Sequence, residues 1–277
     1  MIPALLLLGL LAAPAPRGYR PDVTGGGRVL AALALDPSAR DAALDALQAE
    51  GVGVDTPDQD GILPLTRVIW RGEYAAAEAL LARGASLERA GGVALCTYAV
   101  ENGDPEILDW LLAHGVPLNA PGAEDAPLAA AVRMERLELG RSVLARGGDA
   151  RWADPTGLTL VHRSLQHPTL PLLHELLAAG ADPNRPDPQG RPPLLLAVWT
   201  GKPDAVSWLL SAGATMDTDL QRRLAQEAIR WGYAETLAVV LQAAPLPRRP
   251  RLVLPPDASD AVRQALSAAG VRTRRGR

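Results

Sequence analysis

The stretch from Asp154 to Asn184 reads DPTGLTLVHRSLQHPTLPLLHELLAAGADPN and has the pattern of a short helical hairpin. A turn signal, Asp-Pro-Thr-Gly, opens the stretch, and the pair Leu176-Leu177 precedes Gly180 near its end. The same arrangement begins again at Asp187, where Asp-Pro-Gln-Gly opens a stretch that ends near Gly213. A pattern that restarts after 33 residues predicts a stack of similar small units rather than one globular core.

Glycine marks one position of this pattern along most of the chain. In five of six cases an apolar pair lies three and four residues before that glycine, and three units carry a second glycine twelve residues earlier. A helix often ends at a residue with left-handed backbone, which glycine adopts at little cost. The spacing therefore predicts two helices per unit, with an apolar face that only a neighbouring unit can bury. The repeated glycines are Gly51, Gly84, Gly115, Gly147, Gly180 and Gly213, and the earlier ones are Gly72, Gly103 and Gly201.

Three units carry elements of the signature of a known family. Thr159-Leu160-Val161-His162 resembles the Thr-Pro-Leu-His motif of the ankyrin repeat, and Gly180 to Asn184 matches its Gly-Ala-Asp-x-Asn end. The units that begin at Asp58 and Asp187 share the Pro-Leu and Gly-Ala elements of that family. The resemblance covers residues 27–244, with degenerate units near 91–120 and 121–152. It implies an all-α ankyrin-repeat solenoid of about seven helix-turn-helix units, which we expect to be a monomer.

Residues 1–16 read MIPALLLLGLLAAPAP and are typical of a secretory signal peptide. The apolar run of about twelve residues is too short to span a bilayer, and Ala13-Pro14-Ala15 resembles a cleavage site. We therefore expect a periplasmic or secreted protein. No lysine or arginine precedes the run, and Pro16 follows the cleavage site directly. These two details favour the alternative, in which the segment caps the first repeat of a cytoplasmic protein.

The repeat domain is expected over residues 27–244, between a linker at 17–26 and an extension at 245–277. The linker includes Gly25 and Gly26, the first two residues of a run of three glycines. The extension is rich in proline and arginine, and one capping helix is expected over residues 257–269, followed by a disordered VRTRRGR tail. Eight arginines and two aspartates give the extension a charge of +6. The net charge of the whole chain is −3, so the remaining residues together carry −9.

The sequence offers no cluster of residues for catalysis or metal binding. Its four histidines are spread over separate repeats, and Cys96 is its one cysteine. We therefore expect no enzyme activity, no cofactor, no metal and no small-molecule substrate. The family resemblance implies that His162 is structural and hydrogen-bonds a neighbouring turn. Cys96 is expected to be a buried apolar residue, and Trp110 and Trp208 are expected to pack between neighbouring units.

In ankyrin proteins, the two residues before the glycine that ends the first helix lie on the concave face and touch protein partners. Glu135 and Pro168 replace that glycine in the fourth and fifth units. Three of the six tryptophans fall in these pairs, and tryptophan and arginine are enriched in interface hot spots. The alternative is that each tryptophan packs against the next repeat. The predicted partner-binding residues are Trp70, Arg71, Glu101, Asn102, Arg133, Met134, Gln166, His167, Trp199, Thr200, Arg230 and Trp231.

The sequence thus predicts an exported scaffold that binds a protein partner through its concave face. A narrower alternative is a dedicated inhibitor or chaperone of one co-encoded enzyme or toxin. A third alternative, nucleic-acid binding through the tryptophans and the arginine-rich tail, conflicts with the acidic charge of the body, which repels phosphate. No membrane span is predicted.

Overall fold

A computed structural model describes residues 24–119, 126–170, 172–244, 252–271 and 274–275. The predicted signal peptide at 1–16 and the linker up to residue 23 lie outside the described residues. The chain divides into two compact units, Met1–Pro117 and Leu118–Arg277, and each is described by itself. In the described ranges no helix has both the length and the apolar character needed to cross a membrane.

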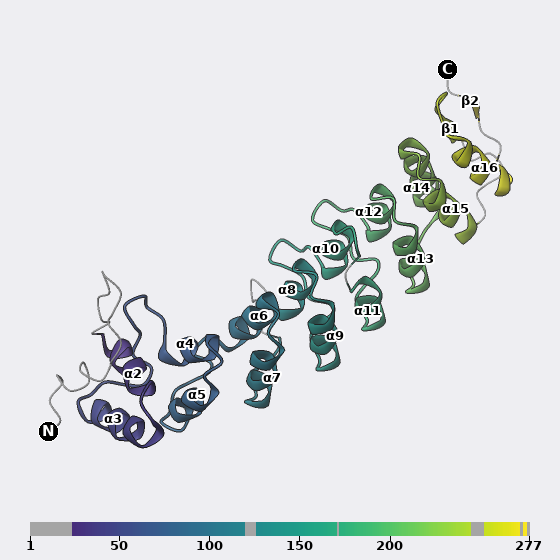
Figure 1. The fold of residues 1–277 in the computed structure, drawn as a ribbon. Coiled ribbons are helices and arrows are strands. Elements are labelled where there is room, and N and C mark those ends of the chain that lie inside the picture. The colour runs from purple at the N-terminus through teal and green to yellow at the C-terminus, as the bar shows by residue number, and fades with distance from the viewer. Residues whose placement is uncertain (1–23, 120–125, 171, 245–251, 272–273, 276–277) are drawn as a thin grey trace. The chain divides into compact units, whose positions relative to one another are not determined.

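The first unit contains three helical hairpins, each made of two antiparallel helices joined by a short corner (Figure 1). Within each hairpin the two helices pack against each other, and neighbouring hairpins of the unit are joined by helix contacts or by aromatic pairs, so the core is built layer by layer. The helices are α2 (Gly25–Leu33) with α3 (Pro37–Ala49), α4 (Pro64–Trp70) with α5 (Tyr74–Leu81), and α6 (Gly92–Asn102) with α7 (Pro105–Ala113).

The second unit contains four more hairpins and a C-terminal extension. Its hairpins are α8 (Pro127–Arg133) with α9 (Leu137–Ala145), α10 (Leu160–Gln166) with α11 (Leu173–Ala178), α12 (Pro193–Trp199) with α13 (Pro203–Ser211), and α14 (Thr218–Trp231) with α15 (Ala234–Ala243). The described residues thus form seven hairpins, which confirms the predicted all-α solenoid of about seven units.

The extension contains the predicted capping helix and a short strand pair. Helix α16 (Asp260–Ala268) packs on α15, as expected for a helix that covers the last hairpin. Strand β1 (Val253–Leu254) pairs in parallel with β2 (Arg274–Arg275), so that Val253 lies opposite Arg274. The prediction of a disordered tail is wrong for these two arginines, because their backbone adds an edge strand to β1.

The helices begin and end where the sequence indicates. Pro64, Pro127 and Pro193 open α4, α8 and α12, at the position where a missing N–H costs no hydrogen bond. Gly84 and Gly213 follow second helices with φ of 89° and 92°. A Cβ at either glycine would meet nothing within 4 Å, so backbone conformation, not crowding, requires glycine there.

The core repeats one leucine or valine position in successive hairpins. The first residue of each predicted apolar pair is fully buried, whereas the second lies nearer the surface. Burial of such a side chain contributes roughly 1.5–3 kcal/mol. The hairpin interfaces therefore supply a large part of the stability of each unit. The buried residues are Leu80, Leu111, Val143, Leu176 and Leu209.

Three turns between hairpins are built around a buried or nearly buried aspartate. Oδ1 of Asp154 accepts hydrogen bonds from the backbone N–H of Thr156 and Leu158, at 2.9 and 3.0 Å, and Oδ2 pairs with Arg163 at 2.7 Å. Asp58 and Asp187 repeat this arrangement. Burial raises the pKa of each carboxyl, but these hydrogen bonds and arginines outweigh it and hold the pKa below its usual value.

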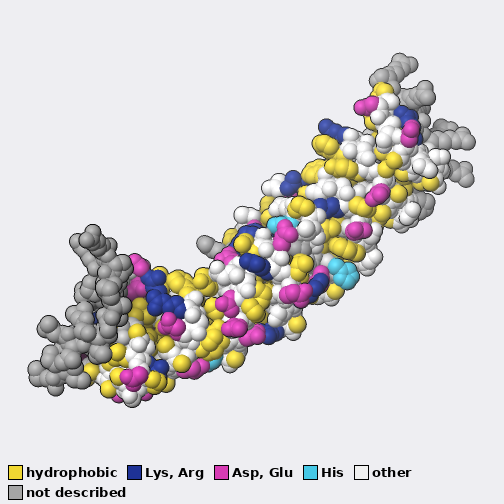
Figure 2. Space-filling model, viewed as in Figure 1, with side chains coloured by type: hydrophobic (Ala, Val, Ile, Leu, Met, Phe, Trp, Pro, Cys, Tyr) yellow, Lys and Arg dark blue, Asp and Glu magenta, His cyan; other side chains and the backbone are white. Residues whose placement is uncertain are grey.

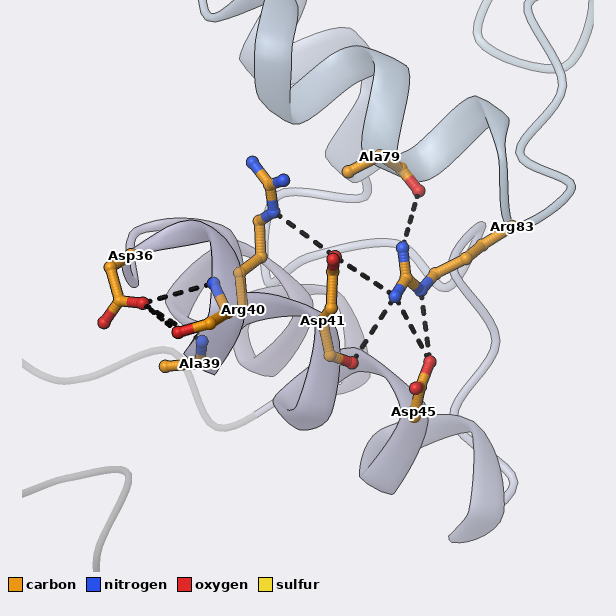
Figure 3. A network of polar contacts seen from close by, with 8 residues as sticks. Asp36, Ala39, Arg40, Asp41, Asp45, Ala79 and Arg83 are labelled. Atoms are coloured by element: carbon orange, nitrogen blue, oxygen red, sulfur yellow. Dashed lines mark hydrogen bonds and ion pairs between the residues drawn. The ribbon is translucent and has the colours of Figure 1, made fainter.

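A polar clamp joins the first two hairpins (Figure 3). Arg83, just after α5, reaches α3, where its Nη2 lies 3.2 Å from carboxylate oxygens of both Asp41 and Asp45. Its Nη1 donates to the carbonyl of Ala79 at 3.2 Å, which fixes the guanidinium over the end of its own helix. Asp36 caps the start of α3 by accepting from the backbone N–H groups of residues 38 and 39.

The prediction of a linker up to residue 26 is wrong at its last two positions. Helix α2 begins at Gly25, and Thr24 caps it by accepting from the N–H of Gly27 at 3.1 Å. A Cβ at Gly26 would lie only 2.4 Å from the backbone nitrogen of Asp58. Gly26 is therefore a packing residue, which lets the turn before the second hairpin cross close over α2.

Candidate binding surface

The twelve predicted partner-binding residues all lie where the first helix of a hairpin ends. The first residue of each pair is the last or next-to-last helical residue, and the second is the last or the capping residue. Four of them belong to the first unit and eight to the second. The structure thus places the predicted pairs at one repeated position, but their surroundings differ.

Two of the three tryptophans in these pairs pack against the next hairpin. The ring centroids of Trp70 and Tyr98 lie 5.3 Å apart, across the boundary between the second and third hairpins. Trp199 donates from Nε1 to Glu227 on α14 at 3.2 Å, and the guanidinium of Arg191 lies 5.7 Å from its ring. Both tryptophans are half-buried, as the alternative interpretation from the sequence requires.

Trp231 has a different environment. It ends α14, the first helix of the last hairpin, and 55% of it is exposed. The guanidinium of Arg230 lies 5.7 Å from its ring. In the described part of the chain, the only other large apolar residues in the exposed class are Met134 at 46%, Leu137 and Val253. Two of these four residues, Trp231 and Met134, thus belong to the predicted pairs.

Some polar side chains of the pairs form hydrogen bonds with the backbone of their own helix. Asn102 donates from Nδ2 to the carbonyl of Tyr98 at 2.9 Å, and Thr200 donates from its hydroxyl to the carbonyl of Leu196 at 2.9 Å. Arg71 is exposed and has one long ion pair with Glu73, at 3.9 Å. Gln166 is also exposed, and Glu101 and Arg133 have partners of their own.

The corners of the fourth and fifth hairpins depart from the repeat. Glu135 adopts a φ of 52° in the position that glycine occupies elsewhere. Its carboxylate lies 3.2 Å from Nδ1 of His167 and accepts from the hydroxyl of Thr169 at 2.8 Å. The hydrogen bond from Thr169 is the largest influence and lowers the pKa of Glu135; burial opposes it, and the contact with His167 adds to the lowering. His167 is therefore turned toward the fourth hairpin.

Lys202 supplies a cap that the sequence pattern did not indicate. Its Nζ donates to the carbonyl oxygens of Leu165 and His167 at the end of α10, the first of these at 2.8 Å. Pro168 stands there in place of the glycine that ends other first helices, so the carbonyls need another donor. Burial lowers the pKa of Lys202.

The residues predicted to be structural have structural surroundings. His162 is fully buried, with Nδ1 2.7 Å from the hydroxyl of Thr159. Burial lowers its pKa, and the backbone of Arg191 and the carboxylate of Asp187 in the next turn act in the opposite direction. Cys96 is fully buried, and burial raises the pKa of its thiol to about 12. The prediction for Cys96 is confirmed, and His162 is buried as expected of a structural residue. The hydrogen bond that its Nδ1 makes goes to Thr159 of its own hairpin, not to a neighbouring turn.

Trp110 and Trp208 pack between neighbouring hairpins, as predicted. The Trp110 ring is stacked on Tyr74 of α5, with centroids 5.7 Å apart, and its Nε1 donates to Glu78 at 3.1 Å. Trp208 meets His174 of α11 edge-on, also at 5.7 Å. These contacts lie among the second helices, away from the predicted pairs.

Basic side chains do not form a continuous surface on the face shown in Figure 2. Arginine side chains there lie among acidic and apolar ones along the length of the chain. Within the described ranges, no three histidine, cysteine or acidic side chains are grouped so that they could hold a metal ion.

Comparisons with known proteins agree with the repeated geometry. The family model described as ankyrin repeats (many copies) matches residues 161–210. A solved ankyrin repeat domain from Acinetobacter baumannii AYE superposes with a TM-score of 0.53 and 24% identity, over 68% of this chain and 97% of that domain. The chain thus has the fold of an ankyrin repeat solenoid, and its residues 161–210 match the ankyrin repeat family. The motif Thr159 to His162, the hairpin pairs and the glycine corners are its ankyrin elements.

One curated protein is similar to part of this chain. The putative palmitoyltransferase ZDHHC13 of Danio rerio is 25% identical over 128 residues, which is 45% of this chain. The matched part is 20% of that protein, so the chain corresponds to a small fraction of its length.

Proposed function

We propose that this ankyrin repeat solenoid is a scaffold that binds a protein partner at the ends of its first helices. The observation that carries the proposal is the exposure of Trp231 with Arg230 beside its ring. A tryptophan that is 55% exposed has apolar surface to bury against a partner. Tryptophan and arginine are also the residue types that most often supply interface hot spots.

The second unit supports this proposal better than the first. Trp70 in the first unit is engaged with Tyr98, and Trp199 in the second unit is engaged with Glu227. Trp231 and Met134 have no such cover and keep about half of their surface exposed. We therefore assign the binding role to the second unit, with Trp231 as the main anchor.

The charge at this site indicates the chemistry of the partner. No ion pair of Arg230 occurs among the described residues, and its contact there is the Trp231 ring. Glu227, one turn earlier on α14, accepts from Trp199 and is already engaged. The site therefore offers a cation beside an indole, which suits a partner segment with a carboxylate next to an apolar side chain.

We also propose that the protein is exported, because residues 1–16 have the composition of a signal peptide. The N-terminal mass of the full-length protein, recovered from separated cell fractions, tests this proposal. A mature start between residues 13 and 17 in the periplasmic or secreted fraction supports export. An intact Met1 in the cytosol contradicts export and leaves the binding proposal untouched.

Affinity capture tests the binding role. Tagged wild-type protein, Trp231→Ala and Val253→Ala are used to capture proteins from an extract of the source cells. Val253 is a matched control because it is 54% exposed and lies outside the predicted pairs. We expect a partner that is retained by wild type and by Val253→Ala but lost from Trp231→Ala. An identical set of proteins on all three baits would contradict the proposed site.

The same experiment separates a general scaffold from a dedicated inhibitor or chaperone. One stoichiometric companion supports the dedicated role, whereas several weak companions support a general scaffold. Both outcomes are read from the proteins that Trp231→Ala fails to retain.

A further inference from the structure

Gln226 of α14 pairs with the backbone of a single residue in the C-terminal extension. Its Nε2 donates to the carbonyl oxygen of Val253 at 3.0 Å, and its Oε1 accepts from the N–H of the same residue at 2.8 Å. A side-chain amide placed in this way pairs with an extended backbone as a neighbouring strand would. Gln226 therefore recognises backbone groups, which any residue other than proline offers, and not the side chain of Val253.

The segment held by Gln226 is extended because of its own sequence. Pro255 and Pro256 follow Leu254 directly. A proline lacks the backbone N–H and disfavours helical conformation in the residue before it. The chain therefore places a strand, β1, against α14, where the repeat pattern would place another first helix (Figure 1).

The two faces and two edges of this strand have different surroundings. Leu252 and Leu254 are 2% and 5% exposed, whereas Val253 between them is 54% exposed, as alternation along a strand requires. One edge of Val253 meets Gln226, and β2 pairs with the strand in parallel, with Leu254 opposite Arg275. We call this environment the strand site: Gln226, the backbone of β2, and the surface that buries the two leucines.

The charge beside the strand site is positive. Arg223 and Arg230 lie three residues before Gln226 and four after it on α14, and both are exposed. Neither arginine has an ion pair within the part of the chain that the structure describes, and Arg230 contacts the ring of Trp231. The segment now in the site has the same sign of charge, because three of the four residues before it in the sequence are arginines. A segment with carboxylates beside its leucines would complement α14 better.

We propose that the strand site binds an extended peptide segment of a partner, with leucines at alternate positions and carboxylates beside them. Residues 252–254 occupy the site as an internal ligand, and the partner segment replaces them by making the same backbone pairs with Gln226 and β2. In such strand addition, backbone hydrogen bonds supply affinity and alternate side chains supply selectivity. The exchange replaces each internal contact by an equal one and adds ion pairs with Arg223 and Arg230. The strand site is separate from Trp231 and goes beyond the function proposed above.

A peptide-binding experiment on the full chain tests the strand site. The probe is the labelled peptide Glu-Glu-Leu-Val-Leu-Pro-Pro-Asp, and its binding is measured by fluorescence anisotropy. In wild type, the internal segment competes at a high effective concentration, so the probe should bind weakly. Val253→Pro removes the N–H that pairs with Gln226 and should bind the probe about tenfold more tightly, because only the internal ligand is weakened. Val253→Ala keeps the backbone groups and is the matched control, which should bind like wild type.

A second variant weakens the internal ligand by another route. Leu252→Ala/Leu254→Ala removes the two buried side chains of the segment and leaves Gln226 and α14 unchanged. This variant should also bind the probe about tenfold more tightly than wild type. If neither this variant nor Val253→Pro binds the probe more tightly than wild type, the strand site is overturned.

The last comparisons test Gln226 and the chemistry of the ligand. Gln226→Met keeps a neutral side chain of similar size but loses both hydrogen bonds, so adding it to Val253→Pro should weaken probe binding about tenfold. A probe with serine in place of both leucines should not bind, and one with arginines in place of the glutamates should bind more weakly. Unchanged binding in the Gln226→Met combination, or equal binding of all three probes, would overturn the proposal. Trp231→Ala should leave probe binding unchanged, so the strand site and the partner site at Trp231 can fail separately.

Discussion

The side chain of Leu172 fills the space that a Cβ on Gly140 would occupy. A Cβ built at Gly140, in the middle of α9, would lie 2.2 Å from Cδ1 of Leu172. Leu172 is buried and caps the start of α11 with a φ of 57°, a left-handed value that is uncommon for leucine. Packing against Gly140 thus offsets the cost of the irregular corner, and it joins the fourth and fifth hairpins.

Gly140→Ala should therefore destabilise the second unit, although alanine favours helices. In an uncrowded helix, this change would stabilise by about 1 kcal/mol. Here the added methyl displaces Leu172, and we expect a net loss of about 1–3 kcal/mol in the free energy of unfolding, measured by urea denaturation.

The double variant Gly140→Ala/Leu172→Ala provides the control for this contact. Removing the leucine makes room for the methyl, so the double variant should lose less stability than the sum of the two single variants. A purely additive result would contradict the direct contact between residues 140 and 172.

Leu176→Ala should weaken the array in the middle of the second unit. Leu176 is fully buried on α11, and its truncation should cost about 2–5 kcal/mol. Because each hairpin is held by its neighbours, the variant should melt earlier or in two steps by circular dichroism. Leu177→Ala, at the next position and nearer the surface, should cost less. A single, unchanged transition for Leu176→Ala would contradict its role in the core.

Stability should fall in acid because of the aspartates in the turns. Folding lowers the pKa values of Asp58, Asp154 and Asp187, so the folded protein binds these protons more weakly than the unfolded chain. The stabilisation is complete above about pH 4, the range of an unperturbed aspartate, and is lost as the pH falls through the lower folded values. Denaturation midpoints measured from pH 6 to pH 2 check this.

Asp154→Asn isolates one turn. The amide oxygen can still accept from the backbone, but the ion pair with Arg163 is lost. We expect the variant to be less stable at neutral pH and to lose less stability on acidification than wild type. An acid response identical to that of wild type would show that Asp154 contributes nothing to it.

Lys202→Ala should uncap α10. The ammonium donates to two carbonyl groups where the corner lacks glycine, and its loss leaves them without this donor. We expect a cost of about 1–3 kcal/mol and faster amide exchange at the end of α10. Lys202→Arg keeps the charge and the donors and should lose less. Equal exchange in Lys202→Ala and wild type would contradict the capping role.

The regular parts of the fold could be predicted because they depend on strict local requirements. Gly84 and Gly213 are needed for a left-handed backbone, and Leu176 and Leu209 are needed in the core. Such requirements recur at fixed spacing and are therefore visible in one sequence. The prolines that open helices are visible for the same reason.

The irregular parts could not be predicted, because they depend on residues that meet only in the folded chain. Gly26 resembles a linker until the turn at Asp58 crosses it, and no local signal places Leu172 against Gly140. The candidate site has the same limit. The helix end predicts where Trp70 lies, but its exposure depends on Tyr98 of the next hairpin.

Trp231 is exposed because α14 is the first helix of the last hairpin. The extension that follows places β1, not another first helix, against α14. A tryptophan at the last helix end thus lacks the aromatic or acidic partner that Trp70 and Trp199 have. The end of the repeat pattern indicates this difference. The residue pairs alone do not, because all three tryptophans belong to such pairs.

The affinity of the captured partner for Trp231→Ala tests the central claim most directly. Isothermal titration calorimetry would compare wild type, Trp231→Ala, Arg230→Gln and the control Val253→Ala. We predict that Trp231→Ala weakens binding by about 30-fold or more, as expected for a hot-spot residue, and that Val253→Ala leaves it unchanged. Arg230→Gln should weaken it less and reduce its salt dependence. Equal affinities for wild type and Trp231→Ala would contradict binding through the end of α14.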